Sequence, residues 1–204
     1  MLLLKFDFPN NYKKYSDEVL SRNLPIFSSY EPGSTFKIIT MASAVEEKVI
    51  DIFNEHFYDS GKVNVDGSVL KCWKSGGHGD QTYLQILQNS CNPGFVVMGQ
   101  KLGTERLYNY VEKFGFMEKT GIDLNGESRG IMFDLEDIGP VEQATISFGQ
   151  GISVTPIQQV TGVSAAINGG KLYKPYVVKY ITEPVSNDIM YENITTSMIK
   201  TIGF

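Results

Sequence analysis

Apolar side chains recur at intervals of three and four residues in several stretches of the chain. The clearest stretch runs from Ser34 to about Glu47 and predicts a helix. Its apolar positions are Ile38, Ile39, Ala42 and Val45. Further helices are predicted at 81–89, from Pro93 to Gly103, from Thr104 to Gly115, and from Pro156 to about 168. Proline at the first helical position and glycine after the last one are typical of helix ends.

Strand patterns are fewer and shorter. Residues 62–65 and 68–72 flank Asp66-Gly67, a dipeptide that tolerates the positive φ angles of a tight hairpin turn. Residues 2–8 and 172–182 also read as strands. Between the periodic segments, residues 75–80 form a glycine-rich loop and residues 116–140 a loop-rich stretch. A short helix is expected at 16–24, and the final residues, 192–204, predict the beginning of another helix.

Composition is that of a globular protein. The chain has 204 residues, 42 % of them hydrophobic and 20 % charged, and this length suits one domain. The net charge is −5 and the lysines are scattered, which argues against a nucleic-acid partner. We find no apolar run of about 18 residues and no signal peptide at the start, so the chain as written would stay in the cytoplasm. Its two cysteines, Cys72 and Cys91, exclude a disulfide framework.

Ser34 and Lys37 form an S-x-x-K pair at the start of a predicted helix. One interpretation is structural: Ser34 caps the helix and Lys37 is a surface lysine. The other is chemical, because a serine hydroxyl becomes a nucleophile when a nearby base takes its proton. Residues three apart share a helix face, and Lys37 can act as that base only if burial and its neighbours lower its pKa.

A second candidate element is the triplet Ser90-Cys91-Asn92, which lies between two predicted helices. The structural interpretation is a helix–turn–helix corner, since serine and asparagine favour turns and Pro93 starts the next helix. In the functional interpretation, Ser90 relays a proton between Lys37 and a leaving group. Asn92 then holds Lys37 in place and hydrogen-bonds the substrate.

Several longer segments resemble one family. YEPGSTFKIITMASAVEE, CWKSGGHGDQT, NSCNPGF, FGQGISVTPIQ and AAINGGKLYKP are similar to stretches of class B penicillin-binding protein transpeptidase domains, of the spore-cortex and cell-division types. The resemblance covers essentially the whole chain. It implies an α/β fold of the penicillin-binding transpeptidase and serine β-lactamase type, present mainly as its helical lobe with an incomplete antiparallel sheet.

The resemblance also implies a reaction and its residues. The family's enzymes are peptidoglycan D,D-transpeptidases that cross-link stem peptides and bind β-lactams. Ser34 resembles the acylated nucleophile, Lys37 the proton acceptor, Ser90 the proton shuttle and Asn92 the substrate-binding asparagine. The backbone N–H of Ser34 would supply half of the oxyanion hole. Full-length relatives are expected to be membrane-anchored and to work outside the cytoplasm.

The family's third motif, K-[S/T]-G, does not occur in this sequence. The near match at 200–203, Lys-Thr-Ile-Gly, falls where the family has an ordinary helix. We therefore expect residues 1–204 to form a single partial transpeptidase domain, without the anchor, the pedestal domain and the later sheet strands. Removing one oxyanion donor costs about a hundred- to a thousandfold in rate. The alternative function is an inactive fragment that at most binds zinc or a partner.

Cys72, His78, Asp80 and Cys91 form a candidate metal site, because zinc takes thiolate, imidazole and carboxylate ligands. A Cys72–Cys91 disulfide or two free thiols are the alternatives. A subset of the resembled family with such cysteines looks like a zinc-binding group, which favours one structural zinc ion. His56 is interpreted as structural. Two further interpretations concern loops: Gly149-Gln150-Gly151 sets a tight turn, and Glu127 is a surface residue rather than a deacylating carboxylate.

Overall fold

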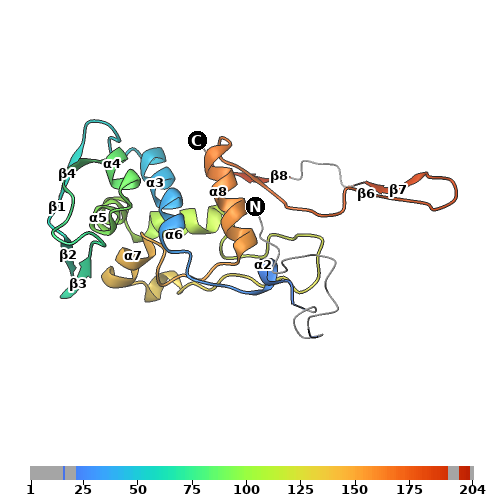
Figure 1. Cartoon of the computed structure of the whole chain (residues 1–204), viewed down its shortest axis with the longest axis horizontal. Helices are drawn as coiled ribbons and strands as arrows, with labels where there is room; N and C mark the ends of the chain where they lie inside the picture. The colour runs from blue at the N-terminus through green and yellow to red at the C-terminus, as the bar shows by residue number, and fades with distance from the viewer. Residues whose placement is uncertain (1–15, 17–21, 193–197, 203–204) are drawn as a thin grey trace.

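The computed structural model describes residue 16, residues 22–192 and residues 198–202 (Figure 1). The strand predicted at 2–8 lies outside the described residues, as does most of the helix predicted at 16–24. Helices occupy the middle of the molecule and short two-stranded sheets lie toward its two ends (Figure 1). Among the described residues, no helix is both long and apolar enough to cross a membrane.

The helices follow the predicted periodicity closely. The α-helices are α2 (Leu24–Phe27), α3 (Lys37–Glu46), α4 (Tyr83–Gln88), α5 (Asn92–Leu102), α6 (Thr104–Lys113), α7 (Pro140–Ile146) and α8 (Pro156–Ile167), and the 3₁₀ turns are η2 (Gly33–Phe36) and η3 (Leu135–Asp137). The predicted helix at Ser34 therefore begins with a 3₁₀ turn, a common start for an α-helix. Helix α7 was not predicted, because it is short and follows a loop-rich stretch.

The strands pair in four antiparallel two-stranded sheets. They are β1 (His56–Asp59) with β4 (Gly79–Thr82), β2 (Lys62–Val65) with β3 (Ser68–Lys71), β5 (Lys171–Tyr173) with β8 (Met198–Thr201), and β6 (Tyr180–Thr182) with β7 (Ile189–Glu192). The predicted hairpin is confirmed, with φ angles of 48° at Asp66 and 81° at Gly67.

Three expectations about strands need correction. The strand predicted at 172–182 is interrupted and appears as parts of β5 and β6. The helix predicted for 192–204 is wrong where the chain is described, since β8 is a strand bonded to β5 and this long-range pairing overrides the local pattern. The glycine-rich loop at 75–80 runs directly into β4, which pairs with β1.

Helix α3 connects the two parts of the hydrophobic core. On one side Ile39, and Phe36 just before the helix, pack with residues of α6 and α8. The ring of Phe36 also makes a tilted contact at 5.3 Å with the ring of Phe116, which follows α6. On the other side Met41 and Ala44 belong to a cluster built around α5. Because both clusters include residues of α3, the helix is packed from two sides, which fixes the position of its first turn.

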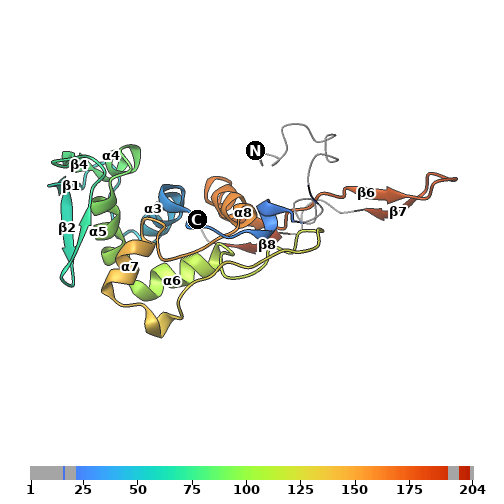
Figure 2. The same cartoon turned by 60° about the horizontal axis from the view of Figure 1, so that its bottom comes forward.

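The β6–β7 hairpin projects away from this body, as Figures 1 and 2 both show. Its base is fastened by Asp123, whose carboxylate accepts hydrogen bonds from the backbone N–H of Val177 at 2.7 Å and of Val178 at 2.8 Å. The arm lies at the opposite end of the molecule from β1–β4. It therefore does not contribute to the site described next.

Candidate functional site

Ser34 is an exposed residue in the 3₁₀ turn that leads into α3. The turn is held from behind by the segment after α7: Gly33 has φ +54° and donates its N–H to the Gly149 carbonyl at 2.8 Å. A Cβ on Gly149, whose φ is +84°, would lie 2.1 Å from the Gly33 carbonyl oxygen. The predicted turn at Gly149-Gln150-Gly151 is confirmed, and it also supports the backbone beside Ser34.

Lys37 lies one turn beyond Ser34, and only 1 % of its surface is exposed. The surface-lysine interpretation is therefore wrong. Its Nζ donates three hydrogen bonds, to the Ser90 carbonyl at 2.8 Å, to Ser90 Oγ at 2.9 Å and to Asn92 Oδ1 at 2.6 Å. It also sits 5.3 Å from the centre of the Phe95 ring. The structure thus brings the S-x-x-K lysine into contact with the S-x-N corner.

Burial lowers the pKa of Lys37 to about 8, against an opposing influence of the thiols of Cys91 and Cys72. An amine in an apolar setting loses the hydration that stabilises its charged form. A lysine with such a pKa has an appreciable neutral fraction near neutral pH. It can therefore accept a proton, which an exposed lysine does far less readily.

The corner between α4 and α5 has an unusual backbone. Ser90 has φ +51°, a left-handed conformation that a non-glycine residue seldom adopts. The backbone N–H groups of Ser90 and Cys91 donate to Leu87 and Ile86 at the end of α4. This conformation turns both the carbonyl and the hydroxyl of Ser90 toward Lys37. Strained residues of this kind concentrate at functional sites.

The corner also touches the neighbouring β2–β3 hairpin. Asn92 Nδ2 donates to the Lys71 carbonyl at 3.3 Å, while Oδ1 of the same amide accepts from Lys37. Trp73, just after β3, donates its indole N–H to the Asn89 carbonyl at 2.8 Å. Sequence patterns gave no sign of these contacts, which depend on how the hairpin packs.

Beneath this corner lies a cluster of possible metal ligands. Asp59, Cys72, His78 and Cys91 each offer one ligand atom, and these atoms all lie within 4.8 Å of one another. Three of the four were predicted. The fourth was expected to be Asp80, which is wrong: its carboxylate is exposed and bonds His56 Nδ1 at 2.7 Å.

The register of β1 and β4 explains this correction. Asp59 lies opposite Gly79, so its side chain reaches the His78 end of the glycine-rich loop, whereas Asp80 lies opposite Tyr58. Neighbouring residues on a strand point to opposite faces, and Asp80 therefore faces solvent. Asp59 is fully buried and accepts hydrogen bonds from the backbone N–H of His78 at 3.0 Å and from Cys91 Sγ at 3.2 Å.

Burial and hydrogen bonds together set the pKa values of the cluster. Burial alone would raise the pKa of Asp59, but hydrogen bonds from His78, Cys72 and Cys91 outweigh it and lower that pKa to about 2. Burial raises the pKa of the Cys91 thiol to about 12 and also raises the pKa of Cys72. Both thiols are free rather than joined as a disulfide.

The donor set fits a zinc ion chemically. His78 Nδ1 lies 2.9 Å from Asp59 Oδ2 and 3.4 Å from Cys72 Sγ, so this nitrogen faces the other ligand atoms. Two sulfurs, one imidazole nitrogen and one carboxylate oxygen are ligands that zinc takes in tetrahedral sites. All four residues are largely removed from solvent, as in a closed structural site.

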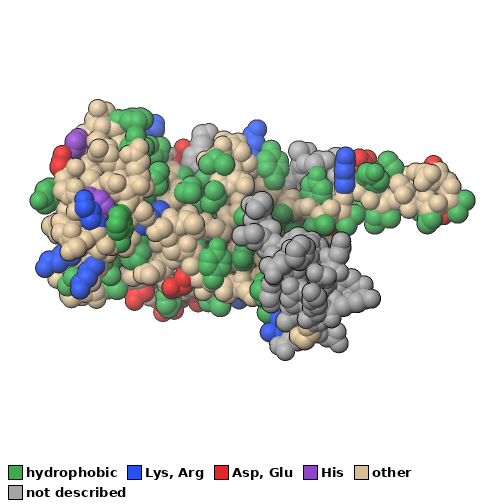
Figure 3. All heavy atoms as spheres, in the orientation of Figure 1, with side chains coloured by type: hydrophobic (Ala, Val, Ile, Leu, Met, Phe, Trp, Pro, Cys, Tyr) green, Lys and Arg blue, Asp and Glu red, His purple; other side chains and the backbone are tan. Residues whose placement is uncertain are grey.

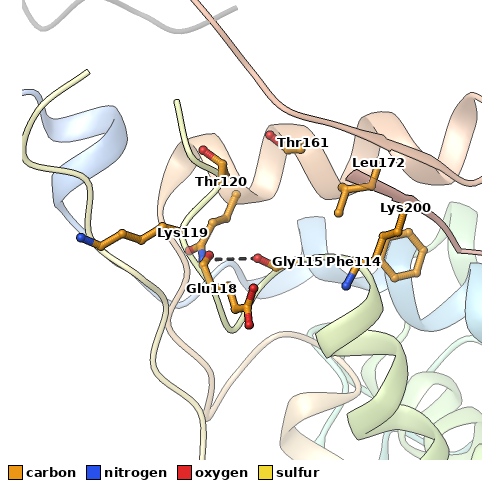
Figure 4. Close-up of a pocket in the computed structure, with 9 residues that line it drawn as sticks. Phe114, Gly115, Glu118, Lys119, Thr120, Thr161, Leu172 and Lys200 are labelled. Atoms are coloured by element: carbon orange, nitrogen blue, oxygen red, sulfur yellow. Dashed lines mark hydrogen bonds between the residues drawn. The ribbon is translucent and has the colours of Figure 1, made fainter. Parts of the chain in front are cut away.

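A separate small pocket lies between α6, α8 and the β5–β8 sheet, and none of the residues of this site lines it (Figure 4). Phe114, Leu172 and Lys200 form part of its wall, and Gln158 spans it by donating to the Gly115 and Phe116 carbonyls. Its volume is only about 40 Å³. Such a space suits a water molecule or two rather than a peptide substrate.

Glu127 also has a structural place. Its carboxylate accepts hydrogen bonds from the backbone N–H groups of Thr120 at 2.7 Å and Gly121 at 3.0 Å. It closes a loop between α6 and η3. This agrees with its interpretation as a loop residue rather than a deacylating carboxylate.

Comparison with known proteins gives the same family as the motifs. Stage V sporulation protein D of Bacillus subtilis (strain 168) is 60 % identical over 178 residues, which cover 87 % of this chain and 28 % of that protein. Peptidoglycan D,D-transpeptidase FtsI of Escherichia coli (strain K12) is 27 % identical over 197 residues, or 95 % of this chain and 32 % of the relative. The chain thus spans about a third or less of these two relatives.

Solved structures share the fold. Penicillin-binding protein 3 from Mycobacterium tuberculosis, complexed with aztreonam, superposes with a TM-score of 0.78 at 26 % identity and covers 88 % of this chain and 40 % of that one. The family model described as the penicillin binding protein transpeptidase domain matches residues 5–202. The chain therefore belongs to the penicillin-binding protein transpeptidase family.

Proposed function

We propose that Ser34 is the nucleophile of a peptidoglycan D,D-transpeptidase and forms an acyl-enzyme with stem peptides and with β-lactams. One observation carries this proposal: the buried Lys37, one turn from Ser34, donates to both Ser90 and Asn92. A penicillin-binding protein 3 of the same family has been solved with bound aztreonam and with bound ampicillin, which supports β-lactams as ligands of this chain too.

The residues divide the acylation step among them. A neutral Lys37 keeps two N–H donors and one lone pair, so it releases one of its three hydrogen bonds and takes the proton of Ser34 Oγ. Ser34 Oγ then bonds to the carbonyl carbon of the scissile D-Ala-D-Ala amide. The proton passes through Ser90 Oγ to the leaving nitrogen as the C–N bond breaks and D-alanine departs.

The second half-reaction reverses these roles. An amine of a neighbouring stem peptide attacks the Ser34 ester carbonyl and loses a proton by the same route to Ser34 Oγ, which leaves as the hydroxyl. Asn92 orients the peptide backbone and holds Lys37. The backbone N–H of Ser34, at the start of α3, supplies one donor to the oxyanion of each tetrahedral intermediate.

Acylation tests this proposal directly. The chain is incubated with a penicillin and its intact mass is measured. An adduct is expected on the native chain and none on Ser34→Ala. Thr35→Ala is the matched control, because it removes the neighbouring hydroxyl, which donates to the Pro32 carbonyl at 2.8 Å, and should keep the adduct. An adduct that survives in Ser34→Ala would contradict the assignment of the nucleophile.

We also propose that Asp59, Cys72, His78 and Cys91 hold one structural zinc ion. The buried two-sulfur, one-nitrogen, one-oxygen donor set supports this choice. Such an ion would fix Cys91, whose neighbours Ser90 and Asn92 bond Lys37. Its contribution would be to stabilise the fold around that corner, since structural zinc sites supply folding energy.

Elemental analysis of the purified chain, prepared with zinc present, tests this site. One zinc per chain is expected. Asp59→Asn should lower the zinc content and the melting temperature, and Asp80→Asn is the matched control that should change neither. A chain with no zinc and a Cys72–Cys91 disulfide found by mass spectrometry would refute the proposal.

The second candidate function is a non-catalytic one, in which the chain keeps the fold and the zinc ion without acylation. The contacts of Lys37 allow it, because its three hydrogen bonds all go to the corner between α4 and α5 and so also serve the fold. The penicillin experiment separates the two candidates, since only the transpeptidase gives an adduct on Ser34. As for location, relatives of this chain are longer proteins, and we propose that the full-length form works outside the cytoplasm on the cell wall.

A further inference from the structure

An open cleft of about 390 Å³ lies beside the active-site corner. Its lining includes three lysines, Lys62, Lys71 and Lys74, together with Trp73, and among the described residues it contains no carboxylate. We propose that this cleft binds the free carboxylates of peptidoglycan stem peptides. The inference rests on the proposed function and adds where the substrate's negative charge is recognised.

The charge arrangement of the cleft is costly for the fold alone. Lys62 and Lys71 lie directly opposite each other on the paired strands β2 and β3, and both are exposed. Like charges at facing positions of an antiparallel pair destabilise it. No ion pair within the described part of the chain engages either of them. An anionic ligand between the two lysines would turn this repulsion into attraction.

The grouping of lysines at this cleft is also unusual for a chain with a negative net charge. The net charge is −5, yet lysines gather at this end of the molecule, over the β2–β3 hairpin at the left of Figure 3. A concave surface lined by one sign of charge concentrates oppositely charged ligands. The cleft would therefore draw a carboxylate-bearing peptide toward the reacting residues.

Two hydrogen bonds join the cleft to the site. The Lys71 carbonyl accepts from Asn92, and Trp73 donates to the Asn89 carbonyl, so the lysine strand and the S-x-N corner share a wall. A peptide whose backbone meets Asn92 would have its next residues over Trp73 and the lysines. Stem peptides fit this chemistry, since their acidic residues and chain ends carry free carboxylates.

Trp73 provides the readout. It is the only tryptophan in the chain, and 68 % of its surface is exposed, so its fluorescence reports on the cleft. A synthetic stem pentapeptide with free carboxylates is titrated into the chain, and its fully amidated counterpart is titrated in parallel. The carboxylated peptide should bind several times more tightly, and its affinity should fall as salt is added.

Lysine variants test which residues of the cleft bind the carboxylates. Lys71→Gln and Lys74→Gln should each weaken binding about twofold to fivefold, as expected for exposed charge pairs. Lys179→Gln is the matched control: it makes the same change on the projecting hairpin and should leave affinity unaltered. Equal affinity for the two peptides, unchanged affinity in Lys71→Gln and Lys74→Gln, or no saturable binding by fluorescence and calorimetry would each overturn the proposal.

The same proteins separate this proposal from the transpeptidase proposal. Penicillin adducts on Ser34 are measured for each lysine variant. A native chain that forms the adduct but binds the two peptides equally overturns the cleft alone. A carboxylate preference without any adduct leaves the cleft and contradicts the acylation. A polyphosphate that displaces the peptide at far lower concentration would assign the cleft to phosphate polymers instead, against the proposal.

Discussion

The rate at which penicillin acylates Ser34 should rise with pH, because its base is a buried lysine. Burial lowers the pKa of Lys37 to about 8. Below that pH the amine keeps its proton and cannot accept another from Ser34. The neutral fraction is about 9 % at pH 7 and about 91 % at pH 9 for a group of this pKa, so the rate should increase about tenfold between them.

The assay is the appearance of the acyl-enzyme by intact mass between pH 6 and pH 9.5, with circular dichroism at each pH to confirm folding. The half-maximal rate is expected near pH 8. Lys200→Gln is the matched control: burial also lowers the pKa of this lysine, but it lies by the pocket between α6 and α8. Its variant should keep the same profile.

Two results would refute the reasoning. A flat profile in folded protein would mean that proton transfer to Lys37 does not limit acylation. A rate that still rises about tenfold per pH unit up to pH 9.5, as for a lysine with the ordinary pKa of 10.5, would mean that the environment of Lys37 does not lower its pKa in solution. In the second case the three hydrogen bonds to Ser90 and Asn92 would hold a cation near neutral pH, and another group would have to act as the base.

Two further predictions concern stability and use urea denaturation. Gly149→Ala should lower the free energy of unfolding by more than the ~1–2 kcal/mol of a left-handed alanine, because its Cβ would also meet the Gly33 carbonyl. Gly126→Ala, with similar φ and open space around it, should lose only the conformational part. Equal losses in the two variants would contradict the contact. Phe36→Ala should lower the free energy of unfolding by about 3–5 kcal/mol, because Phe36 is fully buried. Phe53→Ala is the control: Phe53 is 70 % exposed, so this change should alter the free energy of unfolding by less than about 0.5 kcal/mol.

Local sequence signals predicted most of the helical lobe. The helices α3, α4, α5, α6 and α8 follow apolar periodicity and end signals, and the β2–β3 hairpin follows from Asp66-Gly67. These features depend on neighbouring residues only. Pairings between distant segments were missed, namely β1 with β4 and β5 with β8. No local pattern encodes them, and in β8 the pairing overrides a segment that looked helical.

The candidate site was also predicted only in part from the sequence. Ser34, Lys37, Ser90 and Asn92 were found through motifs and family resemblance, and the structure brings the last three into hydrogen-bonding contact. That Lys37 is buried could not be read from its spacing to Ser34 alone. It follows from the packing of α3 against α5, which places the lysine over Phe95.

The metal cluster gives the sharpest contrast. His78 and the two cysteines were found by residue type, but the carboxylate was chosen by proximity in sequence, which selected Asp80. The buried carboxylate of the cluster is Asp59, 19 residues before His78 and brought to it by the β1–β4 register. Knowing that β1 exists would have identified it, because strand alternation puts Asp59 and Asp80 on different faces.

One experiment tests whether Ser34 is a nucleophile served by Lys37 and Ser90. The most direct measurement is to locate the penicillin adduct by tandem mass spectrometry of the folded, zinc-supplied chain, alongside Lys37→Gln. We expect one adduct, on Ser34, and a strongly reduced yield in Lys37→Gln. A folded chain that carries no adduct, or carries it on another residue, would show that Ser34 is not the nucleophile.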